Sequence, residues 1–106
     1  MIVAIHLSGA DLVDPARAAL VGLAACPGYV RGSVGRSADD PGAWLLLTEW
    51  ENVGSYRRAL GAYQVKVTLT PLMADAQDLP SAFESLVEAG PDGSVTTYES
   101  YREPSR

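Results

Sequence analysis

Cysteine and histidine are nearly missing from this chain, which holds only Cys26 and His6. One cysteine excludes an internal disulfide and a cysteine-based metal cluster, and one histidine excludes a histidine-rich metal site. Cys26 suits a small buried apolar position next to Pro27. The sequence also has no P-loop, GxGxxG, GxSxG or zinc-ligand spacing, so no established catalytic signature is present. We therefore predict no metal site.

Long apolar runs and positive charge are also scarce. No run of about 18 apolar residues exists, which predicts that no segment spans a membrane. The first residues, MIVAIHLSGADLVD, lack the basic flank and apolar length of a signal peptide, so we expect a cytoplasmic protein. A net charge of −5 argues against bare nucleic acid or an anionic membrane as a partner. The 106 residues, 47% of them hydrophobic, predict a single folded domain over 1–106.

Strand-like and helix-like patterns alternate along the chain. The predicted strands are 2–7, 29–37, 43–50, 81–87 and 94–101, and helices are predicted to begin at Asp14-Pro15, with Asp14 as the cap, and after Asn52. The segment 64–70, QVKVTLT, alternates like a strand, whereas Pro71 and the surrounding order suit a second helical piece ending near Ala76. The pattern leaves both open. The order βαββαβ with an extra C-terminal strand is the ferredoxin-like plan of an α+β protein.

Each predicted element has one apolar face. Strand 2–7 places Val3, Ile5 and Leu7 on one side, and the two helices are predicted to bury stripes at helical spacing: Ala16, Leu20, Leu23 and Ala24 in the first, and Val53, Tyr56, Leu60 and Tyr63 in the second. Helices on one side of a ferredoxin-like sheet leave its other side bare. A bare apolar face is normally buried against a second copy, so we expect a homodimer. The strand at 94–101 could pair within its own protomer or with the partner.

Aromatic residues concentrate where strand 43–50 enters the following helix. Trp44, Thr48 and Trp50 share one strand face, and Tyr56 and Tyr63 project from the helix. If that face lies under the helices, the rings either fill the core or line a slot for a flat aromatic ligand, because such a slot needs apolar walls with a few polar groups.

Several polar residues could serve such a slot. Thr48 and Asn52 are close enough in sequence to satisfy buried indole and phenol groups, and Asn52 is also a good helix cap. Arg57 either belongs to a solvated face or neutralises an enolate or phenolate. His6 is either a strand histidine at the dimer interface or a general base.

A series of short motifs resembles the antibiotic biosynthesis monooxygenase family. The motifs are Pro27-Gly28-Tyr29 after the first helix, RSADDP at 36–41, Glu49-Trp50 at a strand end, Asn52 four residues before Tyr56, and Pro71-Leu72. The resemblance runs from Met1 to about Val87. It implies a dimeric α/β barrel of two ferredoxin-like protomers, and it favours a helix at 64–70.

The resemblance also implies a function. Enzymes of this family oxidise polycyclic phenols or hydroquinones with O2 and without metal or flavin, so it implies no cofactor and a small aromatic substrate, such as an anthrone or a hydroquinone. Trp50 and Tyr56 match the strand-end tryptophan and the early-helix aromatic of the family, and Asn52 lies between them. From the resemblance and the residue pattern together, we predict catalytic roles for Trp50, Tyr56 and Asn52, with Trp44, Thr48, Tyr63 and Arg57 around the substrate. The histidine that many members carry on the second helical segment is absent, and Tyr63 falls near its place, which argues against haem cleavage. The alternative is a non-oxidative member that binds or cyclises a polyketide.

Overall fold

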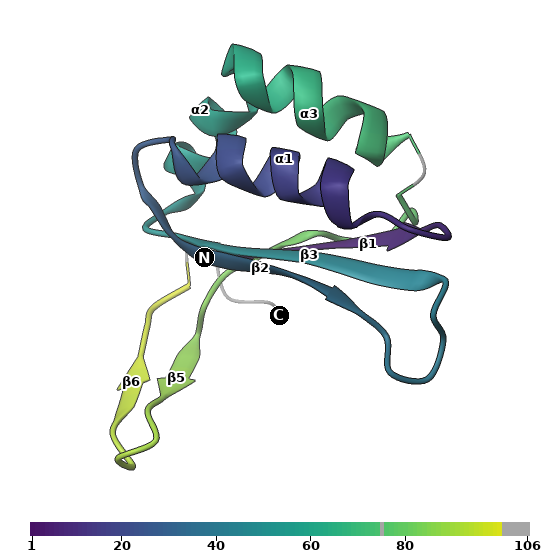
Figure 1. Cartoon of the computed structure of the whole chain (residues 1–106). Helices are drawn as coiled ribbons and strands as arrows, with labels where there is room; N and C mark the ends of the chain where they lie inside the picture. Colours follow the sequence, from purple (N-terminus) through teal and green to yellow (C-terminus); the bar gives the residue numbers. More distant parts are fainter. Residues whose placement is uncertain (75, 101–106) are drawn as a thin grey trace.

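Three helices cover one face of a four-stranded antiparallel sheet (Figure 1). The computed structural model describes residues 1–74 and 76–100. Its elements are β1 (Ile2–Ser8), α1 (Val13–Ala24), β2 (Tyr29–Arg36), β3 (Ala43–Trp50), α2 (Val53–Leu60), α3 (Tyr63–Met73), β4 (Ala82–Phe83), β5 (Val87–Ala89) and β6 (Val95–Thr97). The sheet order is β2-β3-β1-β4. This arrangement confirms the α+β, ferredoxin-like prediction for the protomer.

The contested segment 64–70 is helical and lies within α3. Val65, Leu69 and Leu72 recur at helical spacing and are buried against the rest of the core. Val67, which a strand would place on the same side as Val65, is 50% exposed. Pro71 falls near the end of α3, where a missing N–H affects only the last turn. The burial of one helical face therefore outweighs the local alternation.

The start of α1 differs from the prediction. Leu12 occupies the N-cap position without a side-chain hydrogen bond, and the Asp14 carboxylate instead accepts a bond of 2.9 Å from Arg17 one turn later. Asp14 as the cap was therefore wrong, because the helix begins two residues earlier, at Val13. The predicted stripe was partly wrong as well, since Ala19 is buried and Ala24 is exposed. In α2, Leu60 was predicted to belong to the buried stripe, but it is 38% exposed.

The two predicted C-terminal strands are shorter than expected. Only β4 joins the sheet, pairing with the start of β1 through Ile2 opposite Phe83. β5 and β6 form a separate hairpin whose turn includes Gly93 at φ +88°, a conformation that glycine adopts without a steric penalty. The hairpin extends from the sheet on the side away from the helices (Figure 1). Tyr101, the predicted end of the last strand, lies outside the described residues.

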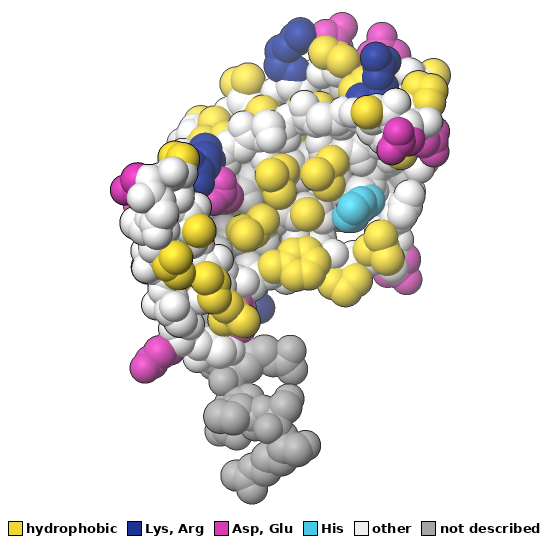
Figure 2. Space-filling model, turned by 90° about the horizontal axis from the view of Figure 1, so that it is seen from below, with side chains coloured by type: hydrophobic (Ala, Val, Ile, Leu, Met, Phe, Trp, Pro, Cys, Tyr) yellow, Lys and Arg dark blue, Asp and Glu magenta, His cyan; other side chains and the backbone are white. Residues whose placement is uncertain are grey.

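The two faces of the sheet have different environments. Val3, Ile5 and Leu7 of β1 are at most 2% exposed beneath the helices. No described helix covers the opposite face, which presents apolar side chains around a histidine (Figure 2). By strand alternation and register, this open face carries Ile2, Ala4, His6, Leu45, Leu47 and Phe83. His6 therefore lies on the side of the sheet opposite the helices.

Candidate active site at the strand-to-helix junction

Three aromatic rings meet where β3 leads into α2. Trp50 packs against both Tyr29 and Tyr56. Its ring centroid is 5.5 Å from that of Tyr29, in an edge-to-face arrangement, and 5.7 Å from that of Tyr56. Trp50 is 2% exposed and Tyr56 is 8% exposed, so the strand and helix bury these rings between them. The predicted convergence of Trp50 and Tyr56 is therefore present. Aromatic pairs in such geometries contribute about 0.5–1.5 kcal/mol beyond their area burial.

The indole N–H groups of both tryptophans find partners inside the protein. Trp50 Nε1 donates to Thr48 Oγ1 at 2.9 Å, and Trp44 Nε1 donates to the Gly9 carbonyl at 3.0 Å. Thr48 is only 1% exposed. The guanidinium of Arg36 lies 5.4 Å from the Trp44 ring centroid. Thr48 therefore supports the Trp50 indole, whereas Trp44 is held at the opposite end of β3, where it pairs with Leu7.

Asn52 begins α2 as an N-cap. Its Oδ1 accepts from the backbone N–H of Ser55 at 2.9 Å and from the Ser55 hydroxyl at 3.0 Å. This confirms the capping prediction, and it places the Asn52 side chain in the helix terminus. Arg57 and Tyr63 are exposed, Tyr63 by 76%, so the structure does not bring them to Trp50. Tyr63 begins α3 and faces outward, contrary to the predicted stripe.

An apolar slot of about 270 Å³ opens beside Tyr56 between α2 and α3. Its lining residues are Tyr56, Leu60, Val65, Lys66, Leu69, Thr70 and Met73. Burial alone raises the pKa of the Tyr56 phenol, and its hydroxyl makes no hydrogen bond to any described residue. Tyr56 therefore stays protonated at neutral pH and offers an O–H donor to a ligand in the slot.

Sequence reasoning missed the α3 wall of this slot. Lys66 and Thr70 lie four residues apart, so one face of a helix brings them together. The strand-like alternation of 64–70 obscured that relation. Helical spacing of Val65, Leu69 and Leu72 was the signal that could have revealed it.

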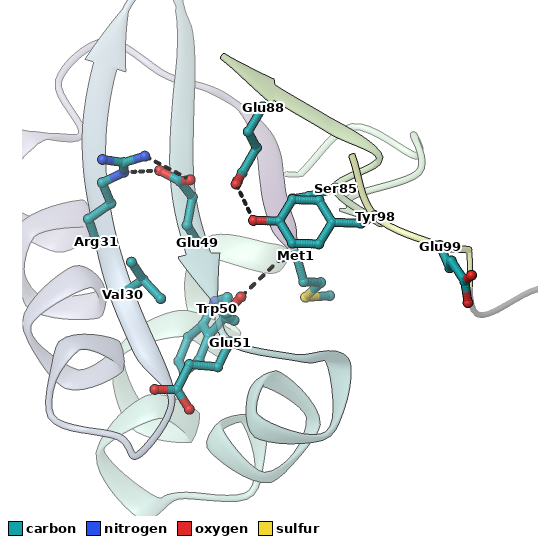
Figure 3. A pocket seen from close by; sticks show the side chains of 10 residues that line it. All are labelled: Met1, Val30, Arg31, Glu49, Trp50, Glu51, Ser85, Glu88, Tyr98 and Glu99. Atoms are coloured by element: carbon teal, nitrogen blue, oxygen red, sulfur yellow. Dashed lines mark hydrogen bonds and ion pairs between the residues drawn. The ribbon is translucent and has the colours of Figure 1, made fainter. Parts of the chain in front are cut away.

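A second cavity, of about 530 Å³, lies between the sheet and the β5–β6 hairpin (Figure 3). Arg31 of β2 forms a two-pronged ion pair with Glu49 of β3, and this bond is the main cause that lowers the pKa of Glu49. Across the cavity, Tyr98 donates to Glu88 Oε1 at 2.6 Å, which raises the pKa of Tyr98. The remaining lining residues are Met1, Val30, Trp50, Glu51, Ser85 and Glu99.

Charge distinguishes the two cavities. The larger one is lined by four carboxylates, and its one arginine is already paired with Glu49. An enolate or phenolate would be repelled there. The slot has no carboxylate in its lining and contains Lys66 together with the Tyr56 hydroxyl. The slot is therefore the better site for a substrate that becomes negatively charged.

His6 and Cys26 are not among the residues that line the slot. His6 is on the open face, and the thiol of Cys26, two residues after the end of α1, donates to the Gly22 carbonyl at 3.5 Å. Residues 1–74 and 76–100 contain no group of three His, Cys, Asp or Glu side chains arranged to hold a metal ion. Within the same residues, no helix is long and apolar enough to cross a membrane.

The fold and the junction place the chain in a class of small ferredoxin-like α+β domains with an aromatic strand end beneath the helices. The sequence model of the antibiotic biosynthesis monooxygenases matches residues 8–70, more than half of the chain. The chain belongs to this family, which confirms the resemblance drawn from its motifs. A search among curated proteins finds no match.

Solved structures share the fold at low sequence identity. A Deinococcus radiodurans protein assigned to the antibiotic biosynthesis monooxygenases is 17% identical, with a TM-score of 0.60 over 100% of this chain and 98% of that one. SnoaB, a cofactor-independent oxygenase from Streptomyces nogalater, is 21% identical, with a TM-score of 0.59 over 80% of this chain and 93% of its own. At these identities the likeness establishes the fold.

Proposed function

We propose that this protein is a monooxygenase that uses O2 without a metal or flavin to oxidise a small phenolic aromatic, such as a hydroquinone or an anthrone. The observation that carries the proposal is Tyr56, a buried phenol against Trp50 that lines an apolar slot and makes no hydrogen bond to any described residue. Family membership and the fold shared with a cofactor-independent oxygenase support it. The slot is slightly smaller than the ~300 Å³ at which small-molecule sites usually begin, which favours a compact substrate.

The proposed chemistry uses the substrate itself as the reductant. Loss of one proton turns a hydroquinone or anthrone into an electron-rich anion that transfers electrons to O2. In the anthrone case the CH2 carbon becomes a carbonyl carbon, so one oxygen atom enters the product and the other leaves as water. The protein's contribution is to exclude water and to stabilise the oxyanion of the substrate, here through the Tyr56 O–H. Trp50 holds the Tyr56 ring in position from the β3 side.

A non-oxidative function is the second candidate. The slot's described lining contains no carboxylate or imidazole that could act as a general base. Such a site suits a protein that binds or cyclises an aromatic polyketide without O2. Product mass separates the two functions, because oxygenation adds oxygen to the product and cyclisation does not.

The test is oxygen uptake in buffer with a metal chelator, using a panel of hydroquinones and anthrones with and without the protein. We expect protein-dependent uptake with an oxygen-enriched product, and loss of turnover in Tyr56→Phe, because this variant keeps the ring but removes the donor. A loss of about 10²-fold is expected for an oxyanion donor. Unchanged turnover in both Tyr56→Phe and Trp50→Phe would show that the site is assigned wrongly.

We also propose that the protein is a homodimer joined through the open face of the sheet. The support is the apolar character of that face, where Leu45 and Leu47 are only partly buried and Phe83 is 45% exposed. Analytical ultracentrifugation tests this: a Leu47→Asp variant should sediment as a monomer when the unmodified chain sediments as a dimer. A monomeric unmodified chain at micromolar concentration would refute the proposal.

A further inference from the structure

Lys66 is the only lysine of the chain and the only charged side chain among the residues that line the slot. It lies on α3, and Tyr56 of α2 lines the same slot. Among residues 1–74 and 76–100, the ion pairs are Arg17 with Asp14 and Arg31 with Glu49, so Lys66 has no acidic partner there. The one lysine of this acidic protein therefore lies in the lining of an apolar slot.

The walls beside Lys66 favour a partner of opposite charge. Val65, Leu69 and Met73 give the slot its apolar lining, and an anion among them needs a compensating cation and hydrogen-bond donors. Lys66 supplies the charge and up to three N–H donors, and Tyr56 supplies one O–H donor. Bonds from such groups to a charged oxygen are about twice as strong as neutral ones.

We propose that Lys66 binds the ionised oxygen of the substrate, so that the slot selects small phenols and enols as their anions. This inference rests on the slot being the substrate site of the proposed function. The bound form of the substrate is then the phenolate or enolate. Its binding residue, Lys66, lies outside the strand-to-helix junction.

The inference also assigns the proton's path. The slot's lining contains no carboxylate or imidazole to accept a proton, and burial raises the pKa of the Tyr56 phenol, so Tyr56 acts as a donor at neutral pH. On α2, Arg57 and Arg58 are also cationic and lie outside the lining. The substrate therefore gives its proton to water before it enters the slot. The pH dependence of kcat/KM should then follow the ionisation of each substrate rather than one fixed enzyme group.

A spectroscopic probe tests anion selection without turnover. 4-Nitrophenol absorbs at different wavelengths in its neutral and ionised forms, and its electron-withdrawing nitro group makes it a poor reductant of O2. Titrated with the full chain, the bound probe should ionise at a lower pH than the free probe. In Lys66→Met, which keeps an unbranched apolar chain, that shift should become smaller because only the Tyr56 donor remains, and phenolate affinity should fall about tenfold. Lys66→Arg, which keeps the positive charge, should retain most of the spectral shift and of the phenolate affinity.

Two controls complete the design. Arg17→Met removes a cation that lies outside the slot's lining and should leave the spectral shift intact. 4-Nitrotoluene, a neutral analogue, should bind equally to the unmodified chain and to Lys66→Met. An undiminished shift in Lys66→Met, or no phenolate binding by the unmodified chain, would overturn the inference. Lys66-dependent phenolate binding without oxygen uptake would preserve it and refute only the oxygenase proposal.

Discussion

The hydrogen bond between Trp50 and Thr48 allows a quantitative test of how the aromatic junction is built. Thr48→Val replaces the hydroxyl that accepts from Trp50 Nε1 at 2.9 Å with a methyl group of similar size. Trp50 is 2% exposed and Thr48 is 1% exposed, so water cannot readily replace the lost acceptor. The buried indole N–H is left unsatisfied in the folded protein.

The expected cost follows from that unpaired donor. Leaving one buried polar group without a partner costs about 1–3 kcal/mol, so the free energy of unfolding should fall by that amount in Thr48→Val. Trp50→Phe removes the donor as well as part of the ring. In that background Thr48→Val should cost little, since no indole N–H remains to be satisfied. The two changes should therefore be coupled by about 1–2 kcal/mol.

Urea unfolding of the four proteins, followed by circular dichroism, measures this coupling. Each midpoint and slope gives a free energy of unfolding, and the double-mutant cycle isolates the pairwise term. Both side chains are buried in the core, so changes in surface solvation contribute little to the comparison. Additive losses would refute the reasoning, because they would mean that Thr48 does not satisfy Trp50.

The remaining predictions concern the loop before β2 and the ion pair on the open side of the sheet. Gly28→Ala should cost at least about 1–2 kcal/mol, because Gly28 has φ +87° and a Cβ there would lie 2.2 Å from Ser55 Oγ. Gly35→Ala, where a Cβ meets nothing within 4 Å, is the matched control for the same thermal-unfolding comparison and should change stability little. Arg31 lowers the pKa of Glu49 in the folded protein. The ion pair should therefore stabilise the fold fully above the unfolded-state pKa near 4.5, and this stabilisation should be lost as the pH falls through the lower folded-state pKa. Because solvent screens this ion pair, Glu49→Gln should reduce the pH-dependent part of the free energy of unfolding by only about 0.2–1 kcal/mol. Urea titrations at several pH values measure this part. The same pH profile for Glu49→Gln and the unmodified chain would contradict the prediction.

The sequence alone determined the alternation of β3 and the order of the main elements. Residues two apart on a strand share a face, so the pattern of residue types is enough to group Trp44, Thr48 and Trp50 together. The Asn52 cap was predictable for a similar reason, because a side-chain oxygen at that position can reach a free N–H of the first helical turn. Both depend on contacts only a few residues apart.

Tertiary structure decided the features that depend on distant contacts. Segment 64–70 became a helix because burying Val65 and Leu69 against the core outweighed the local strand-like pattern. That helix then placed Lys66 in the lining of the same slot as Tyr56 and turned Tyr63 outward. The local pattern fixes which residues share a face, but only the packing of α3 against α2 and the sheet fixes which face encloses the slot.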